Sequence, residues 1–218
     1  MRISGCIIAK NEQNNIATCI ASLRGIVDEI IVVDTGSEDD TVRIAEDLGA
    51  FVVNQRWDDD FSKARNYALE KAKGDWVVFL DADEYFTEEM AAGVRPLLEK
   101  VHPDRNVDGI RSGIIHIDKD TGYLIGNDST VRIYRNYKKI RYINKIHEEI
   151  RNNGEVLKCY DVRTGLSVMH TGYSPSLQME KARRNLDMLL DSPENDKSLY
   201  YLATTYQILE DYENASRY

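Results

Sequence analysis

Cysteine and long apolar runs are both scarce in this chain, and each absence argues against certain classes of protein. Its 218 residues include three cysteines, Cys6, Cys19 and Cys159, which lie far apart without a C-x-x-C pair. This pattern suggests neither a disulfide framework nor a zinc site, and it fits a reducing, cytoplasmic setting. No stretch approaches the roughly 20 apolar residues of a transmembrane helix. Met1 leads directly into a strand-like segment, which is too short for a signal peptide and has no cleavage site.

Basic residues are outnumbered as well. The chain has 28 Lys and Arg against 37 Asp and Glu, which gives a net charge of −9. This balance argues against nucleic acid as a partner, because the phosphate backbone is bound mainly through basic side chains. With 42% hydrophobic and 30% charged residues, the composition is that of an ordinary soluble globular protein.

The N-terminal half alternates apolar runs with amphipathic segments. The apolar runs predict buried strands over residues 3–9, 29–34, 51–53 and 76–80. The helical spacing predicts helices over residues 11–23, 41–48, 61–73 and 87–101. Near-continuous apolar strands that alternate with such helices indicate a parallel sheet covered on both faces.

The pattern changes after the fourth helix. Residues 108–118 and 129–143 alternate between apolar and polar, with glycines between them, and 162–170 reads as a last strand. Alternation of this kind predicts antiparallel strands added to the parallel sheet. We expect the sheet domain to cover residues 1–175.

Residues 176–218 read as helical throughout. The spacing of Leu199, Leu202, Ala203 and Tyr206, followed by a second short helix, resembles a tetratricopeptide repeat. Such repeats need neighbours to bury their faces, so a repeat would imply a longer protein, a tail packed on itself, or a protein partner or oligomer. Two generic helices that complete the domain explain the same pattern, and the sequence does not separate the two interpretations.

The most informative motif is Asp81-Ala82-Asp83, which follows the apolar strand 76–80. Ligands of open α/β sheets collect at the carboxyl ends of the strands. Two carboxylates at that position can hold a hard divalent cation, which prefers oxygen ligands. The alternative is that they are solvated turn residues or a helix cap.

Four motifs in order resemble family 2 glycosyltransferases of the GT-A fold, among them bacterial core-sugar glucosyltransferases and peptide S-glycosyltransferases with tetratricopeptide-like tails. They are Lys10-Asn11-Glu12, Asp34-Thr35-Gly36-Ser37, Ala64-Arg65-Asn66 and Asp81-Ala82-Asp83-Glu84. The resemblance is looser at Ile146-His147-Glu148 and His170-Thr171-Gly172-Tyr173. It implies a GT-A fold: an α/β domain with a mostly parallel central sheet, helices on both faces and a C-terminal helical segment. The Gln-x-x-Arg-Trp motif of the membrane-anchored synthases is absent, which disfavours a processive enzyme.

The resemblance also assigns a nucleotide-sugar site. It implies contacts from Ala9, Asn11, Glu12, Asp34, Arg65, Asp81, Ala82 and Arg132. Alternatives stay open for several of them. Asp34 is also a natural turn residue, and Asn11 and Glu12 also fit the start of a helix. Arg65 could instead pair with an aspartate of the acidic run 58–60. Arg132 and Arg135 should face opposite sides of their strand, which would leave Arg135 at the surface.

The same resemblance assigns the metal and the base. Asp83 would ligate Mn²⁺ or Mg²⁺ and His170 would be a third ligand, although a lone histidine is as readily structural. Glu148 would be the base that deprotonates the acceptor. Its neighbour Glu149 cannot also face the site if the segment is extended, because adjacent side chains then point to opposite sides. A charged turn remains the alternative for this pair.

Together these expectations predict an enzyme that transfers a hexose from a nucleotide-diphosphate sugar, linked to UDP, to a saccharide, lipid or peptide acceptor. The transfer would depend on a metal and would invert the anomeric carbon. The competing hypothesis is a non-catalytic nucleotide-sugar-binding or scaffold protein that acts through its helical tail. Dehydrogenases and pyrophosphorylases are disfavoured, because a glycine-rich loop is missing from residues 9–12. The sequence does not identify the sugar, the acceptor or the oligomeric state.

Overall fold

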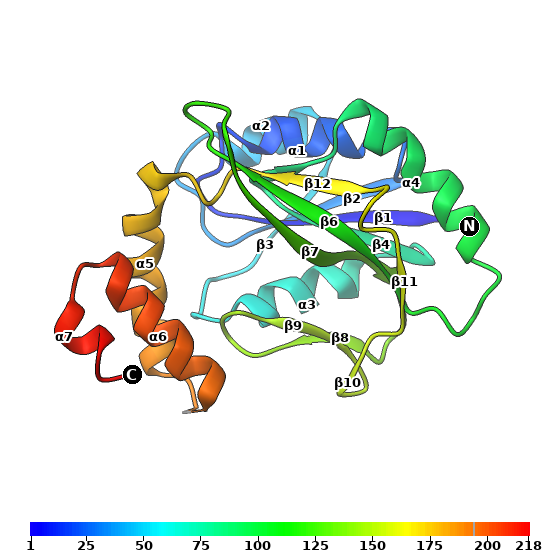
Figure 1. Cartoon of the computed structure of the whole chain (residues 1–218). Helices are drawn as coiled ribbons and strands as arrows, with labels where there is room; N and C mark the ends of the chain where they lie inside the picture. Colours follow the sequence, from blue (N-terminus) through cyan, green and yellow to red (C-terminus); the bar gives the residue numbers. More distant parts are fainter. Residues whose placement is uncertain (194) are drawn as a thin grey trace.

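A nine-stranded sheet organises the computed structural model, which describes residues 1–193 and 195–218 (Figure 1). Its strand order is β3-β2-β1-β4-β7-β6-β12-β5, and β11 pairs with β6. The parallel half contains β1 (Ile3–Ala9), β2 (Glu29–Asp34), β3 (Phe51–Asn54) and β4 (Trp76–Asp81). These strands confirm the four predicted from the apolar runs.

The second half of the sheet mixes directions and brings distant segments together. Its strands are β5 (Glu84–Tyr85), β6 (Gly109–Ile117), β7 (Leu124–Arg135), β11 (Cys159–Asp161) and β12 (Ser167–His170). β7 runs antiparallel to β4 and to β6, whereas β12 runs parallel to β6. The short β5 pairs with β12, so that Glu84 lies opposite His170. This pairing places the Asp-Ala-Asp segment beside the last strand.

Helices cover both faces of the sheet (Figure 1). One face packs against α1 (Ile16–Leu23), α2 (Thr41–Asp47) and α4 (Glu88–Val101). The other packs against α3 (Phe61–Lys71) and a small antiparallel sheet of β8 (Ile140–Ile143), β9 (Glu149–Asn152) and β10 (Glu155–Val156). The fold is the α/β arrangement that the sequence predicts. The segment 129–143, predicted to add antiparallel strands to the parallel sheet, is divided between two sheets, because β7 lies in the main sheet and β8 in the small one.

The first helix starts later than its spacing predicts. Asn11 has a φ of 56°, in the left-handed region, so the helix cannot begin there. The Asn11 side chain instead accepts a hydrogen bond from the backbone N–H of Glu38. The carbonyl of Glu12 then accepts from Ile16, where α1 begins.

Arg135 is buried, so the expectation that it lies at the surface is wrong. Only 1% of it is exposed. Its guanidinium donates to the carbonyls of Val107, His102 and Asp104 at 2.7, 2.9 and 2.8 Å, and it lies over the ring of Trp76. The carbonyls at a helix end lack intrahelical partners, and Arg135 satisfies those that follow α4.

The tail consists of α5 (Pro175–Leu190), α6 (Asp196–Ile208) and α7 (Tyr212–Ala215). These helices lie at one end of the sheet (Figure 1). Met188, Leu189 and Leu202 bury a small cluster with Ile146, which joins the tail to the sheet domain. Within the described ranges, none of the helices combines the length and apolarity that crossing a bilayer requires.

Candidate active site

A pocket opens at the carboxyl ends of β1 and β4, where the sheet domain meets α5. Its volume of about 310 Å³ lies near the lower end of the roughly 300–1,000 Å³ of small-molecule sites. Sequence motifs that are far apart in the chain line it together. The lining includes Ala9, Glu12, Arg65, Asp81, Ala82, Asp83, Arg132, Glu148 and His170.

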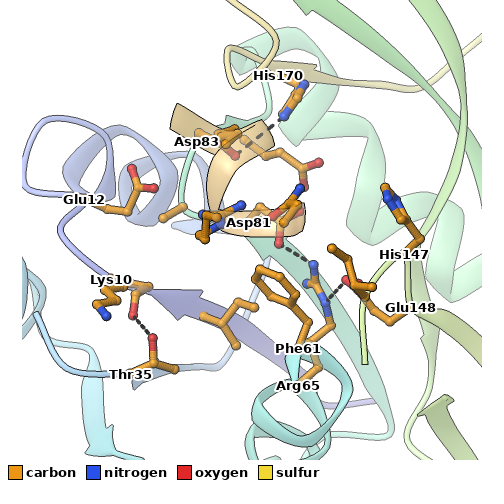
Figure 2. A pocket seen from close by; sticks show the side chains of 18 of the residues that line it. Lys10, Glu12, Thr35, Phe61, Arg65, Asp81, Asp83, His147, Glu148 and His170 are labelled. Carbon is orange, nitrogen blue, oxygen red and sulfur yellow. Dashed lines mark hydrogen bonds and ion pairs between the residues drawn. The ribbon is translucent and has the colours of Figure 1, made fainter. Parts of the chain in front are cut away.

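Charges of alternating sign form one wall, in the order Glu84, Arg132, Asp81, Arg65 and Glu148. Arg132 donates to Asp81 Oδ2 at 2.7 Å and, through Nε, to Glu84 Oε1 at 3.1 Å. Arg65 Nη2 lies 2.7 Å from Asp81 Oδ1, and its Nε lies 2.5 Å from Glu148 Oε1. Figure 2 shows Arg65 between Asp81 and Glu148. Each guanidinium therefore bridges two carboxylates.

Burial makes this wall electrostatically strong. Burial alone would raise the pKa of Asp81, but Arg132 and Arg65 hold that pKa well below its usual range. Burial raises the pKa of Glu84 to about 7, against the opposing charge of Arg132. Asp81 is thus the more acidic of the two carboxyl groups that share Arg132.

Arg65 is the central residue of the wall. Only 4% of it is exposed, and its guanidinium lies 5.0 Å from the ring centroid of Phe79 and 5.3 Å from that of Tyr142. Its Nη1 atom is buried and has no hydrogen-bond partner among the described residues. The two rings fix the plane of the guanidinium, and the N–H groups of this planar group then fix the carboxylates of Asp81 and Glu148.

A second group lies around Asp83. Its Oδ1 is 3.7 Å from His170 Nε2, and its Oδ2 is 2.9 Å from Lys181 Nζ on α5. Figure 2 shows Asp83 and His170 facing each other. Asp83 and His170 are nearly buried, with 11% and 10% of their side chains exposed. A Cβ at Gly172 would lie 2.5 Å from both His170 Nε2 and Lys181 Nζ, and nearer still to Asp83. Only glycine leaves this small space open.

His116 on β6 lies behind His170. The two residues are neighbours in register on parallel strands, and their Nδ1 atoms are 2.8 Å apart. When His170 donates this hydrogen bond, its Nε2 presents a lone pair toward Asp83. Burial lowers the pKa of His170 to about 4, against the charge of Asp83, which favours the neutral ring that metal ligation requires.

The donor set around Asp83 fits a divalent cation with few protein ligands. Among the residues described, no cluster of three or more His, Cys, Asp and Glu side chains is arranged for a metal. Two ligands that each lie about 2.1 Å from one ion are at most about 4.2 Å apart, and the 3.7 Å between Asp83 and His170 meets this limit. Mg²⁺ commonly takes one or two side chains and completes its shell with water and phosphate.

Glu148 and Glu149 point to different surroundings, as expected for neighbours. Glu148 lines the pocket, whereas Glu149 pairs with Lys197 and Arg151. The preceding His147 has a φ of 50° and stacks on Tyr201 of α6, with ring centroids 3.4 Å apart. The tail therefore supports the backbone that presents Glu148.

Two of the expected nucleotide contacts lie outside the pocket lining. Asp34 is buried and accepts hydrogen bonds from the backbone of Gly36 and Ser37, the contacts of a turn residue. Asn11 is held by the same loop. Their contacts with a nucleotide stay predictions.

The acidic run 58–60 is not the partner of Arg65. Asp60 caps α3 by accepting from Lys63 N, Asp58 pairs with the side chain of Lys63, and Asp59 accepts from Trp57. Arg65 instead reaches Asp81 and Glu148.

The sequence motifs missed several pocket residues, and His116, Lys181 and Arg184 are the titratable ones that bear most on the site. Lys181 and Arg184 are three residues apart in α5, a spacing that places them on one helix face. His116 stands in an alternating strand, where its position relative to His170 depends on a register that the sequence does not show.

The chain is similar to known glycosyltransferases over most of its length. Residues 4–146 match the family profile described as "Glycosyl transferase family 2". The "SPbeta prophage-derived glycosyltransferase SunS" of Bacillus subtilis is 33% identical over 97% of this chain and 51% of its own length. A TPR repeat-containing protein of Synechococcus elongatus is 31% identical over 89% of this chain and 49% of its own length. The chain thus spans about half the length of these relatives.

Solved structures show the same fold. TarS of S. aureus, solved in complex with UDP, superposes with a TM-score of 0.56 over 100% of this chain and 73% of that chain. Its sequence is 18% identical, so the likeness concerns the architecture of the sheet and its helices.

Proposed function

This chain belongs to glycosyl transferase family 2, and on that premise we propose that it transfers a hexose from a UDP-linked sugar to an acceptor hydroxyl or thiol, with Mn²⁺ or Mg²⁺ as cofactor. The observation that carries the proposal is the division of one pocket into two sets of side chains. Asp83 and His170 form one set, and Glu148 with Arg65 forms the other. The first suits a donor diphosphate and the second an acceptor nucleophile.

The charge of the pocket supports a donor that arrives with a divalent cation. Its lining carries five cationic side chains and five carboxylates: Lys10, Arg65, Arg132, Lys181 and Arg184, with Glu12, Asp81, Asp83, Glu84 and Glu148. A nucleoside diphosphate sugar carries about two negative charges, which a divalent cation neutralises. The loaded pocket then stays balanced, which avoids the cost of an unpaired buried charge.

The donor is proposed to lie along the strand ends. The backbone of Ala9 and the side chain of Glu12 line the side near β1, while Ala82 and Asp83 line the side near β4. A cation bound at Asp83 and His170 would supply Lewis-acid stabilisation of the departing diphosphate. Arg132 adds a positive charge beside Asp81.

Glu148 is proposed as the base. Arg65 holds its Oε1, and in the described part of the chain no hydrogen bond engages Oε2. That oxygen takes the proton of the acceptor as the acceptor's O or S forms a bond to C1 of the sugar. The bond from C1 to the diphosphate breaks, and its electron pair leaves with the nucleoside diphosphate. Attack opposite the leaving group inverts the anomeric carbon.

A donor screen tests the function. Purified protein is incubated with Mn²⁺ or Mg²⁺ and UDP-, GDP- or dTDP-sugars, and nucleotide release is measured. We expect release from a UDP-sugar that requires the metal and is lost in Asp83→Ala. Asp47→Ala is the matched control, because Asp47 pairs with Arg43 on the exposed surface of α2.

Two outcomes would contradict the proposal. If metal-dependent nucleotide release persists in Asp83→Ala, Asp83 is not a ligand of the metal and the proposed metal site is wrong. No release, together with no thermal stabilisation by UDP and metal, would favour the scaffold function of the tail instead.

A further inference from the structure

Helix α5 places a cation on the carboxylate proposed to bind the metal. Lys181 Nζ lies 2.9 Å from Asp83 Oδ2, and Arg184, one turn further along α5, also lines the pocket. The family profile ends at residue 146, so this cation comes from a segment beyond the matched region. Neither the expected nucleotide contacts nor the expected metal ligands include it.

We propose that Lys181 is an exchangeable counter-ion of the donor site. In the free protein its ammonium neutralises Asp83. When the divalent cation and the donor bind, the cation takes the carboxylate and Lys181 moves to an oxygen of the diphosphate. This inference rests on the proposed function and adds a binding residue from the tail to it.

Space around Asp83 requires the exchange. The groups Asp83 Oδ2, His170 Nε2 and Lys181 Nζ all border the gap left by the missing Cβ of Gly172. A cation between Asp83 and His170 would share this small volume with an ammonium. Two like charges so close together repel strongly where little water screens them. The ammonium must therefore leave as the metal enters.

Lys181 is less constrained than the two arginines that line the same pocket. Arg65 and Arg132 each bridge two carboxylates, with 5% and 16% of their side chains exposed. Lys181 has Asp83 as its single ion-pair partner among the described residues, and 31% of its side chain is exposed. A flexible stem with a point charge can follow a new anion. Phosphate oxygens accept strong, charge-assisted hydrogen bonds from such a group.

Mn²⁺ and UDP titrations test the exchange without measuring turnover. Free Mn²⁺ is followed by electron paramagnetic resonance in the wild type, Lys181→Met and Arg183→Met. Arg183 lies on the same helix, is exposed and does not line the pocket. Without nucleotide, we expect Lys181→Met to bind Mn²⁺ about tenfold more tightly, because a hydrogen bond to a charged group is removed. With saturating Mn²⁺, its affinity for UDP should fall about tenfold, and Arg183→Met should change neither value.

A second variant separates direct competition from a general effect of charge. Arg184→Met removes the same charge one turn away, without a salt bridge to Asp83. We expect its gain in Mn²⁺ affinity to be clearly smaller than that of Lys181→Met. An equal gain would overturn direct exchange, and so would unchanged or weaker Mn²⁺ binding by Lys181→Met.

A crystal structure with Mn²⁺ and UDP gives the direct readout. Lys181 Nζ should lie within hydrogen-bond distance of a phosphate oxygen and no longer of Asp83. A lysine that stays on Asp83 beside the bound metal would refute the proposal.

If Asp83→Ala abolishes Mn²⁺ binding while Lys181→Met leaves it unchanged, the exchange fails and the proposed function stands. If wild-type protein binds neither Mn²⁺ nor UDP, the proposed function fails first.

Discussion

Arg65 Nε lies 2.5 Å from Glu148 Oε1, although the two residues are 83 positions apart in the chain. The contact joins α3 to the segment between β8 and β9. It orients one carboxylate oxygen toward a guanidinium that also contacts Asp81. The position of the proposed base is therefore set by the same arginine that holds the strand end of β4.

Replacement of Glu148 should separate chemistry from binding. In Glu148→Gln the amide cannot take a proton, so we expect turnover to fall by about 10²–10⁴-fold. The affinity for UDP should stay within about threefold, because the amide keeps its shape and removes no phosphate contact. Glu149→Gln is the control, since Glu149 pairs with Lys197 and Arg151 outside the pocket. Equal losses of turnover in the two variants would contradict the assignment.

Arg65→Met should destabilise the fold as well as the site. The change leaves Glu148 without its partner and Asp81 with one guanidinium in place of two. Loss of one member of a buried ion pair typically costs about 3–5 kcal/mol, and we expect a decrease in the free energy of unfolding near the lower value. Urea denaturation measures it, with exposed Arg105→Met as the control. A decrease below about 1 kcal/mol, the usual range of exposed ion pairs, would show that the wall carries no stability.

Gly172→Ala should impair the metal site while leaving the fold intact. The added Cβ would overlap Asp83, His170 and Lys181, and the two proposed ligands have little room to retreat. We expect Mn²⁺ affinity to fall about tenfold or more, as for other changes that disturb ligand orientation. Gly165→Ala is the matched control, because its Cβ would meet nothing nearer than 3.9 Å. Metal affinity that is unchanged in Gly172→Ala would argue against a cation between Asp83 and His170.

Stability should fall in mild acid through His147. Burial lowers its pKa to about 4, although Glu148 acts in the opposite direction and Lys197 in the same one. Because an unfolded histidine titrates near 6.5, the unfolded state takes up the proton first as the pH falls. The contribution of the neutral ring is complete above about pH 6.5 and is lost as the pH falls toward 4, by on the order of 1–3 kcal/mol.

His147→Asn tests this linkage, because asparagine tolerates the left-handed backbone that residue 147 adopts. Urea denaturation at pH 7 and pH 4.5 should show a smaller pH effect in the variant than in the wild type. Part of the change in stability with pH should remain in the variant, because the pKa of His170 is also lowered to about 4. An unchanged difference between the two pH values would exclude His147 as a source.

Strands that are apolar along most of their length were predictable. β1, β2 and β4 follow directly from such runs, because a strand covered on both faces must be apolar on both. The segment 129–143 was harder, since alternation indicates a strand but not the sheet to which it belongs. Arg135 shows the same limit: its partners are backbone carbonyls after α4, and carbonyls leave no trace in a sequence.

The site was predictable in composition and less so in arrangement. The motifs identified Asp83, His170, Arg65 and Glu148, and the structure brings all four into one pocket. Their pairing was not predictable, because the partners come from α3, β4, β12 and the segment before β9. Lys181 was missed for a further reason: a lysine on an amphipathic helix usually faces solvent, and only the packing of α5 turns it toward Asp83.

The short connection between β12 and α5 has a consequence for sequence evolution. Four residues, 171–174, separate His170 from the first residue of α5. The connection is a tight turn in which Thr171 N donates to the carbonyl of Asp83 and Ser174 N donates to the carbonyl of Thr171, so one inserted residue here would break the turn and displace Lys181 from the carboxylate it contacts. Surface connections normally tolerate changes of length, but this one should not. In a library of single-residue insertions, we expect positions 171–174 to be as intolerant as the strands themselves.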